Sequence, residues 1–373
     1  MVPHVVILQS KADELHRNPE AKSMESEKIG VNLQLHNFCS HSIFAVTQFY
    51  FQLPMNKSDL RIVFFGTPDF AVESLRRLLD GGYNVVAVVT APDKPAGRGR
   101  SIQMSDVKKF ALEAGLPVLQ PVKLKDPEFI EQLRSFDAQL FIVIAFRMLP
   151  EAVWQMPPLG TFNLHASLLP RYRGAAPINW AVINGDTETG VTTFFLQHEI
   201  DTGDIIKRES IAIGPDEDAG SVHDRLMMLG ADLTLDTVGH IIAGDLQTTP
   251  QTDVEGETVT HAPKIFKDTC RIDWTRPAAE VHNLVRGLSP YPTAWSTLYA
   301  GDTVQGTLKI FTTRLTDRQA TRPGLITIEP DGRMFVDCAD RALEILSLQA
   351  PGKRRMPTAD FLRGCRLQEM SLK

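Results

Sequence analysis

The stretch Arg61-Ile62-Val63-Phe64-Phe65-Gly66 decides the fold of the larger part of this 373-residue chain. Its four consecutive apolar residues end at a glycine, a pattern typical of a strand that is buried on both faces. Further apolar runs and segments with helical periodicity alternate along the chain, the former at 84–90, 140–145, 162–165, 190–196 and near 205–206, the latter at 69–79, 105–114, 127–135 and 221–243. This alternation predicts an α/β domain with a doubly wound, mostly parallel sheet.

The pattern changes beyond this domain. Residues 246–261 are rich in Thr, Gln, Gly, Asp and Glu and lack hydrophobic periodicity, which predicts a linker. From 262 to 373 the sequence has short strands separated by turns, as in a small β-barrel. Residues 1–54 precede an internal methionine, Met55, and we expect them to be an extension outside the folded domains that a mis-called start codon would explain. The α/β domain is then predicted to cover 59–245.

The charge is distributed unevenly along the chain. The net charge is −6, but the residues from Ala262 onward include 17 basic and 12 acidic side chains, a local charge of +5 that leaves −11 for the rest. Because affinity for phosphates comes from clustered Lys and Arg, a polyanionic partner is expected to contact the C-terminal domain.

Cysteine usage and hydropathy indicate the compartment. The cysteines are far apart and form no C-x-x-C pair, which predicts reduced thiols, no disulfide framework and no metal site: Cys39, Cys270, Cys338 and Cys365. No stretch approaches 18 consecutive apolar residues, and the N-terminal segment contains too many acidic residues for a transit peptide. We therefore expect a cytoplasmic protein that does not contact membranes.

The turn after the first strand excludes one large class of α/β enzymes. It has the sequence Gly66-Thr67-Pro68-Asp69-Phe70 where a dinucleotide-binding domain would have G-x-G-x-x-G. Pro68 stands at the second glycine position, where its ring and missing N–H would prevent close approach of a pyrophosphate. This argues against a nicotinamide-dependent oxidoreductase.

Two polar segments follow later strands. In 163–170, Asn-Leu-His-Ala-Ser-Leu-Leu-Pro, the side chains of Asn163 and His165 would share one face of a strand, because successive strand residues alternate between faces. Such a pair alone is more often two satisfied polar residues, and the second segment, His-Glu-Ile-Asp-Thr-Gly-Asp at 198–204, alone is more often a turn.

Together, these segments supply an amide, an imidazole and a carboxylate. These are the groups that acyl transfer to an amine requires, namely a donor for the developing oxyanion and groups that relocate the amine proton. No serine or cysteine lies in a recognisable nucleophile elbow, so direct transfer to an external nucleophile is the simpler interpretation.

Five motifs in this order resemble those of the methionyl-tRNA formyltransferases: F-G-T-P-D-F at 65–70, P-D-K-P-A-G-R-G-R at 92–100, N-L-H-A-S-L-L-P at 163–170, R-Y-R-G-A-A-P at 171–177 and I-D-T-G-D at 200–204. The resemblance covers about residues 59 to 365. It implies a Rossmann-like formyltransferase domain, an oligonucleotide-binding-like barrel, and formyl transfer from 10-formyltetrahydrofolate to methionyl initiator tRNA by a monomeric, metal-independent enzyme.

The resemblance also implies roles for individual residues. Asn163 would bind the formyl oxygen as it becomes an oxyanion. His165, supported by Asp201, would stabilise charge and protonate the departing folate nitrogen, and Asp201 would help to remove the amine proton. The expected folate contacts are Ser167, Leu168, Leu169 and Pro170. Arg147 departs from the family, which often has a small residue at this edge of the folate pocket.

Two basic segments would contact tRNA. One is the glycine-containing loop after the second strand, with Lys94, Arg98 and Arg100, and the other is the cluster Lys353, Arg354 and Arg355 in the C-terminal domain. Either segment alone would more often be a solvated surface. Their positions in the family favour contact with tRNA phosphates.

Three other functions remain possible from the sequence. A small-molecule formyltransferase acting on a glycinamide ribonucleotide or an amino sugar would share the three catalytic residues, but it would not need a basic C-terminal domain. A folate-dependent hydrolase would release formate without an acceptor. A non-catalytic tRNA-binding module would not need Asn163, His165 and Asp201.

Overall fold

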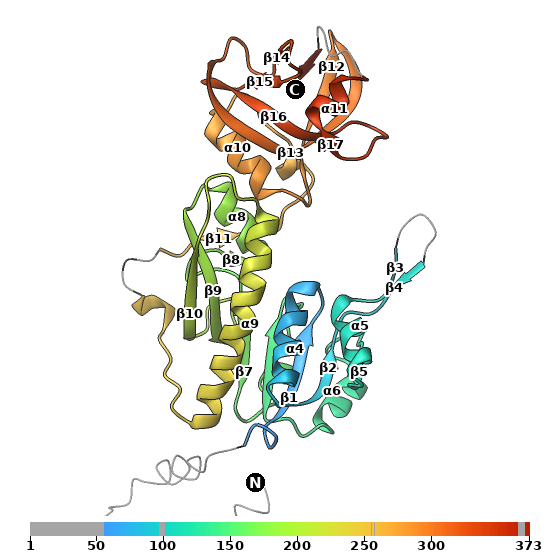
Figure 1. Cartoon of the computed structure of the whole chain (residues 1–373). Helices are drawn as coiled ribbons and strands as arrows, with labels where there is room; N and C mark the ends of the chain where they lie inside the picture. Colours follow the sequence, from blue (N-terminus) through green and yellow to red (C-terminus); the bar gives the residue numbers. More distant parts are fainter. Residues whose placement is uncertain (1–55, 97–100, 255, 257, 365–369) are drawn as a thin grey trace, which may run out of the picture. The chain divides into compact units, whose positions relative to one another are not determined.

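The computed structural model describes residues 56–96, 101–254, 256, 258–364 and 370–373. The predicted extension at 1–54 and the cations Arg98 and Arg100 lie outside these residues. The N-terminal domain is built on a seven-stranded sheet with the order β10-β9-β7-β6-β1-β2-β5 (Figure 1). Its strands are β1 (Arg61–Gly66), β2 (Asn84–Val89), β5 (Val118–Leu119), β6 (Leu140–Ile144), β7 (Thr161–His165), β9 (Glu188–Phe195) and β10 (Ile205–Ala212).

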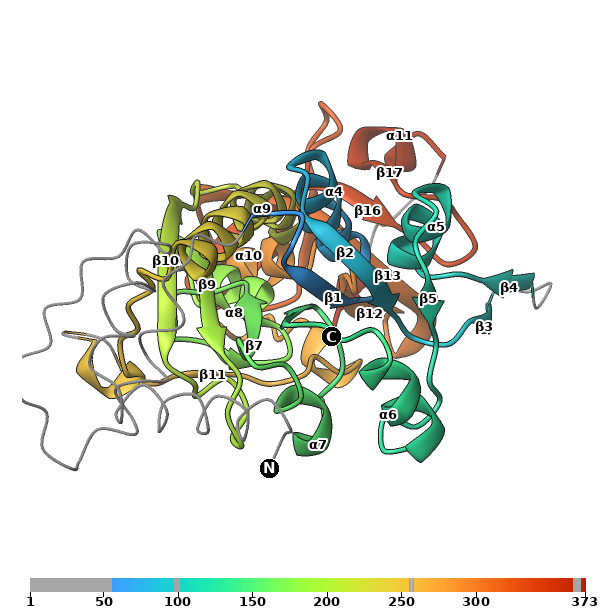
Figure 2. The same ribbon diagram turned by 90° about the horizontal axis from the view of Figure 1, so that it is seen from below.

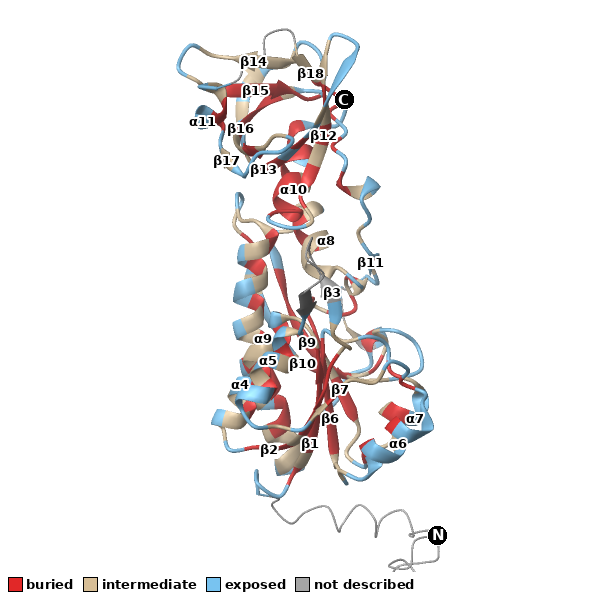
Figure 3. Ribbon diagram, turned by 90° about the vertical axis from the view of Figure 1, so that its right-hand side faces the viewer, coloured by how far each residue is buried: buried red, intermediate tan, exposed pale blue. Residues whose placement is uncertain are grey.

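The sheet is parallel from β5 to β7, whereas β9 runs antiparallel to β7 and β10 antiparallel to β9. The predicted mostly parallel α/β sheet is therefore confirmed. Figure 3 shows that β1 and β6 lie in the most deeply buried part of the domain.

Alternate residues of β1 explain why helices cover both faces of the sheet. Ile62 and Phe64 belong to a core cluster that includes residues of α4 (Val72–Asp80), α5 (Asp106–Glu113) and α9 (Ala219–Ala243). Val63 and Phe65 belong to a second cluster with residues of α6 (Pro127–Arg134) and α7 (Glu151–Trp154). Figure 2 shows α4 and α9 on one side of the sheet and α6 and α7 on the other. Both faces of the sheet are therefore buried beneath helices, as the continuous apolar run of β1 predicts.

Helix α9 is long and apolar enough to cross a membrane by length and composition alone. Asp218 caps its N-terminus by accepting a hydrogen bond from Ser221 N, and Gly244 ends it with a φ of 70°. Its residues Val222, Leu226 and Leu233 are buried in the same core cluster as Ile62 and Phe64. The apolar side of α9 thus packs against the sheet of this domain.

The C-terminal domain is a second seven-stranded, antiparallel and barrel-like sheet, which confirms the predicted small barrel. Six strands follow the order β14-β15-β16-β13-β12-β18, and β17 pairs with β16. Their bounds are β12 (Ala294–Ala300), β13 (Thr303–Gln319), β14 (Ile326–Ile328), β15 (Met334–Asp337), β16 (Arg341–Gln349), β17 (Met356–Pro357) and β18 (Met370–Leu372).

Two helices in this domain were not predicted, α10 (Ala278–Gly287) and α11 (Thr358–Leu362). Helix α10 buries Val281 and Val285 against the barrel core. Burial raises the pKa of the Cys338 thiol in that core to about 12 and also raises that of Cys270, so both thiols are inert.

The predicted linker has more structure than its composition indicates. Its short helix η2 (Gln251–Asp253) and strand β11 (His261–Ala262) lie against the N-terminal domain, because β11 pairs with β8 (Arg173–Gly174) and Thr249 forms a bridge with Ile205. The remaining elements are η1 (Asp69–Ala71), the hairpin of β3 (Lys94–Ala96) and β4 (Ser101–Gln103), α8 (Pro177–Ile183) and η3 (Asp268–Cys270).

Candidate active site

A cavity of about 670 Å³ lies in the N-terminal domain, where the segments after β1, β6, β7 and β9 converge. Its walls contain all three predicted catalytic residues and several apolar side chains, among them Phe70, Phe146, Asn163, His165, Ile200 and Asp201. Large cavities that combine apolar walls with a few convergent polar groups are the usual form of a small-molecule site.

Asn163 is placed by its strand neighbours. Phe162 and Leu164 are buried in the core, so the alternation of β7 directs Asn163 to the cavity face. The Asn163 Oδ1 atom is buried, and no hydrogen-bond donor reaches it among the described residues. Buried polar atoms are nearly always paired in folded proteins. The Oδ1 atom is therefore not used in a hydrogen bond that holds the fold, and the side chain faces the cavity.

His165 is the last residue of β7 and only 7% of it is exposed. Its Nε2 atom lies 2.9 Å from the Tyr172 carbonyl oxygen, which can only accept a hydrogen bond and therefore requires a proton on Nε2. The Nδ1 atom faces Asp201, with 3.9 Å to its Oδ2. Nδ1 is therefore the ring nitrogen that the Tyr172 carbonyl leaves open, and it faces the carboxylate.

Asp201 lies in the loop between β9 and β10. Because β9 is antiparallel to β7 and Phe195 pairs with Phe162, this loop leaves beside the start of β7 and must run back along it to reach His165. Asp201 has a φ of 55°, in the left-handed region. Its Oδ2 atom accepts a hydrogen bond of 2.9 Å from Gly174 N, which fixes the direction of the carboxylate.

The turn of this loop requires Gly203. A Cβ atom at this position would lie 1.6 Å from the Phe195 carbonyl oxygen, so the close approach of the two backbones excludes any side chain. Tyr172 and Gly174 contribute to the site through backbone atoms, and for that reason sequence analysis missed both of them.

The segment Ser167-Leu168-Leu169-Pro170 follows the cavity wall, but none of its residues lines the cavity, although Ala166 does. The Ser167 hydroxyl donates to the Arg171 carbonyl oxygen at 2.6 Å. Contact of these four residues with folate stays a prediction. Arg147 does line the cavity, and its guanidinium donates to the carbonyl oxygens of Pro121 and Val122, which hold it at the rim.

Four of the predicted tRNA contacts are described, and none of these four lines the cavity. Lys94 is exposed in the β3–β4 hairpin, and Lys353, Arg354 and Arg355 are exposed next to β17. Arg355 donates to Ser347 Oγ at 3.1 Å and stacks on Phe311, with 4.5 Å between the guanidinium and the ring centroid. The barrel thus fixes one of these cations.

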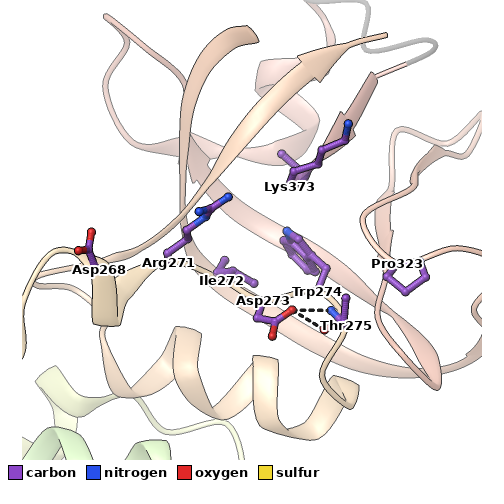
Figure 4. Close-up of a pocket in the computed structure, with 9 residues that line it drawn as sticks. Asp268, Arg271, Ile272, Asp273, Trp274, Thr275, Pro323 and Lys373 are labelled. Atoms are coloured by element: carbon purple, nitrogen blue, oxygen red, sulfur yellow. Dashed lines mark hydrogen bonds between the residues drawn. The ribbon is translucent and has the colours of Figure 1, made fainter. Parts of the chain in front are cut away.

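A second cavity, of about 420 Å³, lies in the C-terminal domain (Figure 4). Arg271 and Lys373 line it together with Trp274, while Asp273 accepts two hydrogen bonds from Thr275. Nearby, Lys267 and Arg271 lie over the ring of Trp295 at 5.7 and 5.9 Å. This part of the barrel therefore combines aromatic rings with side chains of both charges, because Asp268 and Asp273 also line the cavity.

Comparison with known proteins identifies the family. Residues 60–238 match the family model described as formyl transferase, and residues 264–366 match that of the formyl transferase C-terminal domain. A methionyl-tRNA formyltransferase of Bacteroides thetaiotaomicron is 56% identical over 319 residues, which cover 84% of this chain and 98% of that protein. Another, of Porphyromonas gingivalis, is 50% identical over 313 residues, covering 83% and 97%. The chain belongs to the methionyl-tRNA formyltransferase family.

Solved structures of more distant proteins share the fold. An N-formyltransferase of Helicobacter canadensis, in complex with folinic acid and dTDP-3-aminofucose, matches with a TM-score of 0.58 at 18% identity over 80% of this chain and 100% of that one. HypX of Aquifex aeolicus, in complex with tetrahydrofolic acid, matches with a TM-score of 0.57 at 18% identity over 83% of this chain and 48% of that one.

Proposed function

We propose that Asn163, His165 and Asp201 transfer the formyl group of 10-formyltetrahydrofolate to the amino group of methionyl initiator tRNA. One observation carries the assignment of these residues. An amide whose buried oxygen has no donor among the described residues shares a cavity with an imidazole and a carboxylate. The cavity provides a donor for an oxyanion and a pair of groups that can hold a proton.

The chemistry requires two steps at the formyl carbon. The methionyl nitrogen attacks this carbon, and the carbonyl electrons move to the oxygen, which becomes an oxyanion that the Asn163 side-chain N–H stabilises. Collapse of this intermediate breaks the bond to the folate nitrogen. That nitrogen takes a proton from Nδ1 of His165 in its charged form. The carboxylate of Asp201 accepts the proton that the attacking amine loses and returns it to Nδ1.

The two substrates require two kinds of surface. For folate we propose the cavity and the adjoining segment Ser167–Pro170. For tRNA we propose Lys94, Arg98 and Arg100 near the acceptor end, and Lys353, Arg354 and Arg355 in the C-terminal domain. The division into a catalytic domain at 59–245 and a tRNA-binding domain at 262–373, action as a monomer, and location in the cytoplasm are part of this proposal.

The test is an assay with 10-formyltetrahydrofolate and methionine-charged initiator tRNA, followed by detection of N-formylmethionine. We expect formylation of the charged tRNA and none of an amino sugar nucleotide. Formate release at the same rate without tRNA would instead reveal a hydrolase. Formylation of small amines at comparable kcat/KM would show that the C-terminal domain does not direct specificity.

A further inference from the structure

Gln251 is a buried residue of the segment that joins the two domains. Only 6% of it is exposed, although it belongs to a short helix on a polar stretch. Its Nε2 atom donates to the carbonyl oxygens of Asp201, at 2.9 Å, and Gly203, at 2.8 Å. Its Oε1 atom accepts from the guanidinium of Arg173, at 3.0 and 2.6 Å. The side chain thus connects two segments of the active site.

These contacts surround the carboxylate of Asp201. Its left-handed backbone conformation costs on the order of 1 kcal/mol or more, so the surrounding structure has to hold it. Gln251 holds the carbonyl of Asp201 itself and that of Gly203, two residues on. On the other side of the carboxylate, Arg173 precedes Gly174, whose N–H donates to Asp201 Oδ2. The side-chain amide of Gln251 therefore holds the backbone of Asp201 and also Arg173, the residue next to Gly174.

The segment around Gln251 is itself anchored on both sides. Thr249 exchanges backbone hydrogen bonds of 2.8 Å with Ile205, which follows the Asp201 loop, and β11 pairs with Arg173 and Gly174 in β8. The chain on either side of Gln251 is therefore paired with the same two parts of the active site that the Gln251 side chain connects.

We infer that Gln251 is a positioning residue for formyl transfer, which holds the Asp201 carboxylate in place beside His165. This rests on the proposed role of Asp201. A side chain outside the predicted catalytic domain thus supports the backbone that carries Asp201, although none of the described residues of its segment lines the cavity.

Two substitutions isolate the two donated hydrogen bonds. Gln251→Met keeps the volume and removes all four contacts. Gln251→Glu keeps the acceptor for Arg173 but places an oxygen against two carbonyl oxygens. Both should lower kcat by about 10- to 100-fold, because small displacements of catalytic groups are costly, and should leave KM for folate and tRNA within about twofold. Gln247→Met, at an exposed glutamine of the same segment, should change neither constant.

A double-variant cycle separates positioning from general damage to the fold. If Gln251 acts through Asp201, Gln251→Met should cause no further loss of kcat in an Asp201→Ala background, with thermal unfolding showing that each variant is folded. Wild-type kcat in both Gln251 variants, or losses that multiply in the double variant, would overturn the inference. Near-normal turnover of Asp201→Ala alone would instead overturn the role proposed for Asp201.

Discussion

Asn163 faces the cavity because its neighbours in β7 are buried in the core. Its Oδ1 atom accepts no hydrogen bond from any of the described residues. A residue of this kind can be truncated with little effect on the fold. We expect its side-chain N–H to stabilise the transition state, in which the formyl oxygen carries a negative charge that is absent from the bound substrate.

Asn163→Ala should therefore lower kcat by about 10² to 10³, the usual result of removing one oxyanion donor. The melting temperature should stay close to that of the wild type. Steady-state kinetics with thermal unfolding would measure both, and turnover within a few-fold of wild type would remove Asn163 from the mechanism.

His165 and Asp201 should behave as one unit, because the carboxylate faces the ring nitrogen that holds the transferable proton. His165→Ala and Asp201→Ala should each cause a large loss of kcat, and the double variant should be little worse than the poorer single variant. Comparison of the three kcat values decides this, since additive losses in activation free energy would mean that the two groups act separately.

At the scale of elements, helix α9 offers a matched pair of glycines. A Cβ atom at Gly230 would lie 2.6 Å from Leu164 Cδ2, whereas at Gly239 it would meet nothing within 4 Å. Leu164 is 3% exposed and lies between Asn163 and His165, so it cannot move without disturbing the site.

Gly239→Ala should thus stabilise the domain by about 0.5 to 1 kcal/mol, because alanine loses less backbone entropy in a helix. Gly230→Ala should destabilise it and lower kcat, because overpacking a core outweighs that gain. Urea unfolding of the two variants would measure the difference, and equal effects would show that the packing of α9 on β7 tolerates a methyl group.

At the scale of the whole molecule, α10 of the C-terminal domain contacts the loop before α9. His282 in α10 lies 2.9 Å from Thr313 Oγ1 and 3.4 Å from both the Pro215 carbonyl oxygen and Asp216 Oδ1, and Arg286 donates to the Glu217 carbonyl oxygen. Burial lowers the pKa of His282, and Arg286 also lowers it, while the Pro215 carbonyl and Asp216 oppose this shift.

A lowered pKa means that the unfolded chain binds the proton more readily than the folded chain. The stability that the neutral His282 contributes should be complete above the ordinary histidine value of 6.5 and should decrease as pH falls from there through the folded pKa. Urea unfolding at several pH values between about 8 and 5, the window in which histidine titrates, should show that the free energy of unfolding decreases as pH falls. This dependence on pH should be weaker in His282→Gln. An unchanged slope in the variant would assign the effect to other groups.

The basic segments should separate in their kinetics. Replacement of Lys353, Arg354 and Arg355 by alanine should raise KM for tRNA, weaken the salt dependence of binding and leave kcat unchanged, because the tRNA contact that we propose for them lies outside the cavity. Arg98→Ala, near the acceptor end, should also lower kcat. Measurements at several salt concentrations would distinguish them, and an effect on KM alone from both would show that the loop only adds a phosphate contact.

The sequence predicted those features that depend on local patterns. The apolar run of β1 indicated a strand buried on both faces, and N-x-H with D-T-G-D indicated the three side chains that meet in the cavity. The contributions of Tyr172, Gly174 and Gln251 had no such signal, because two act through backbone atoms and the third is 50 positions from Asp201 in a polar stretch. Helix α10 was missed because its short apolar stripe becomes recognisable only against the barrel core.

The pairing of β11 with β8 has a consequence for how this enzyme can be divided. A protein cut after residue 245 would lose the partner strand of Arg173 and Gly174 together with the bridge at Thr249. A protein cut after Ala262 would keep both. An isolated N-terminal domain should therefore keep the geometry around Arg173 and Gly174 only when the cut follows Ala262, so this structural unit extends beyond the predicted boundary at 245.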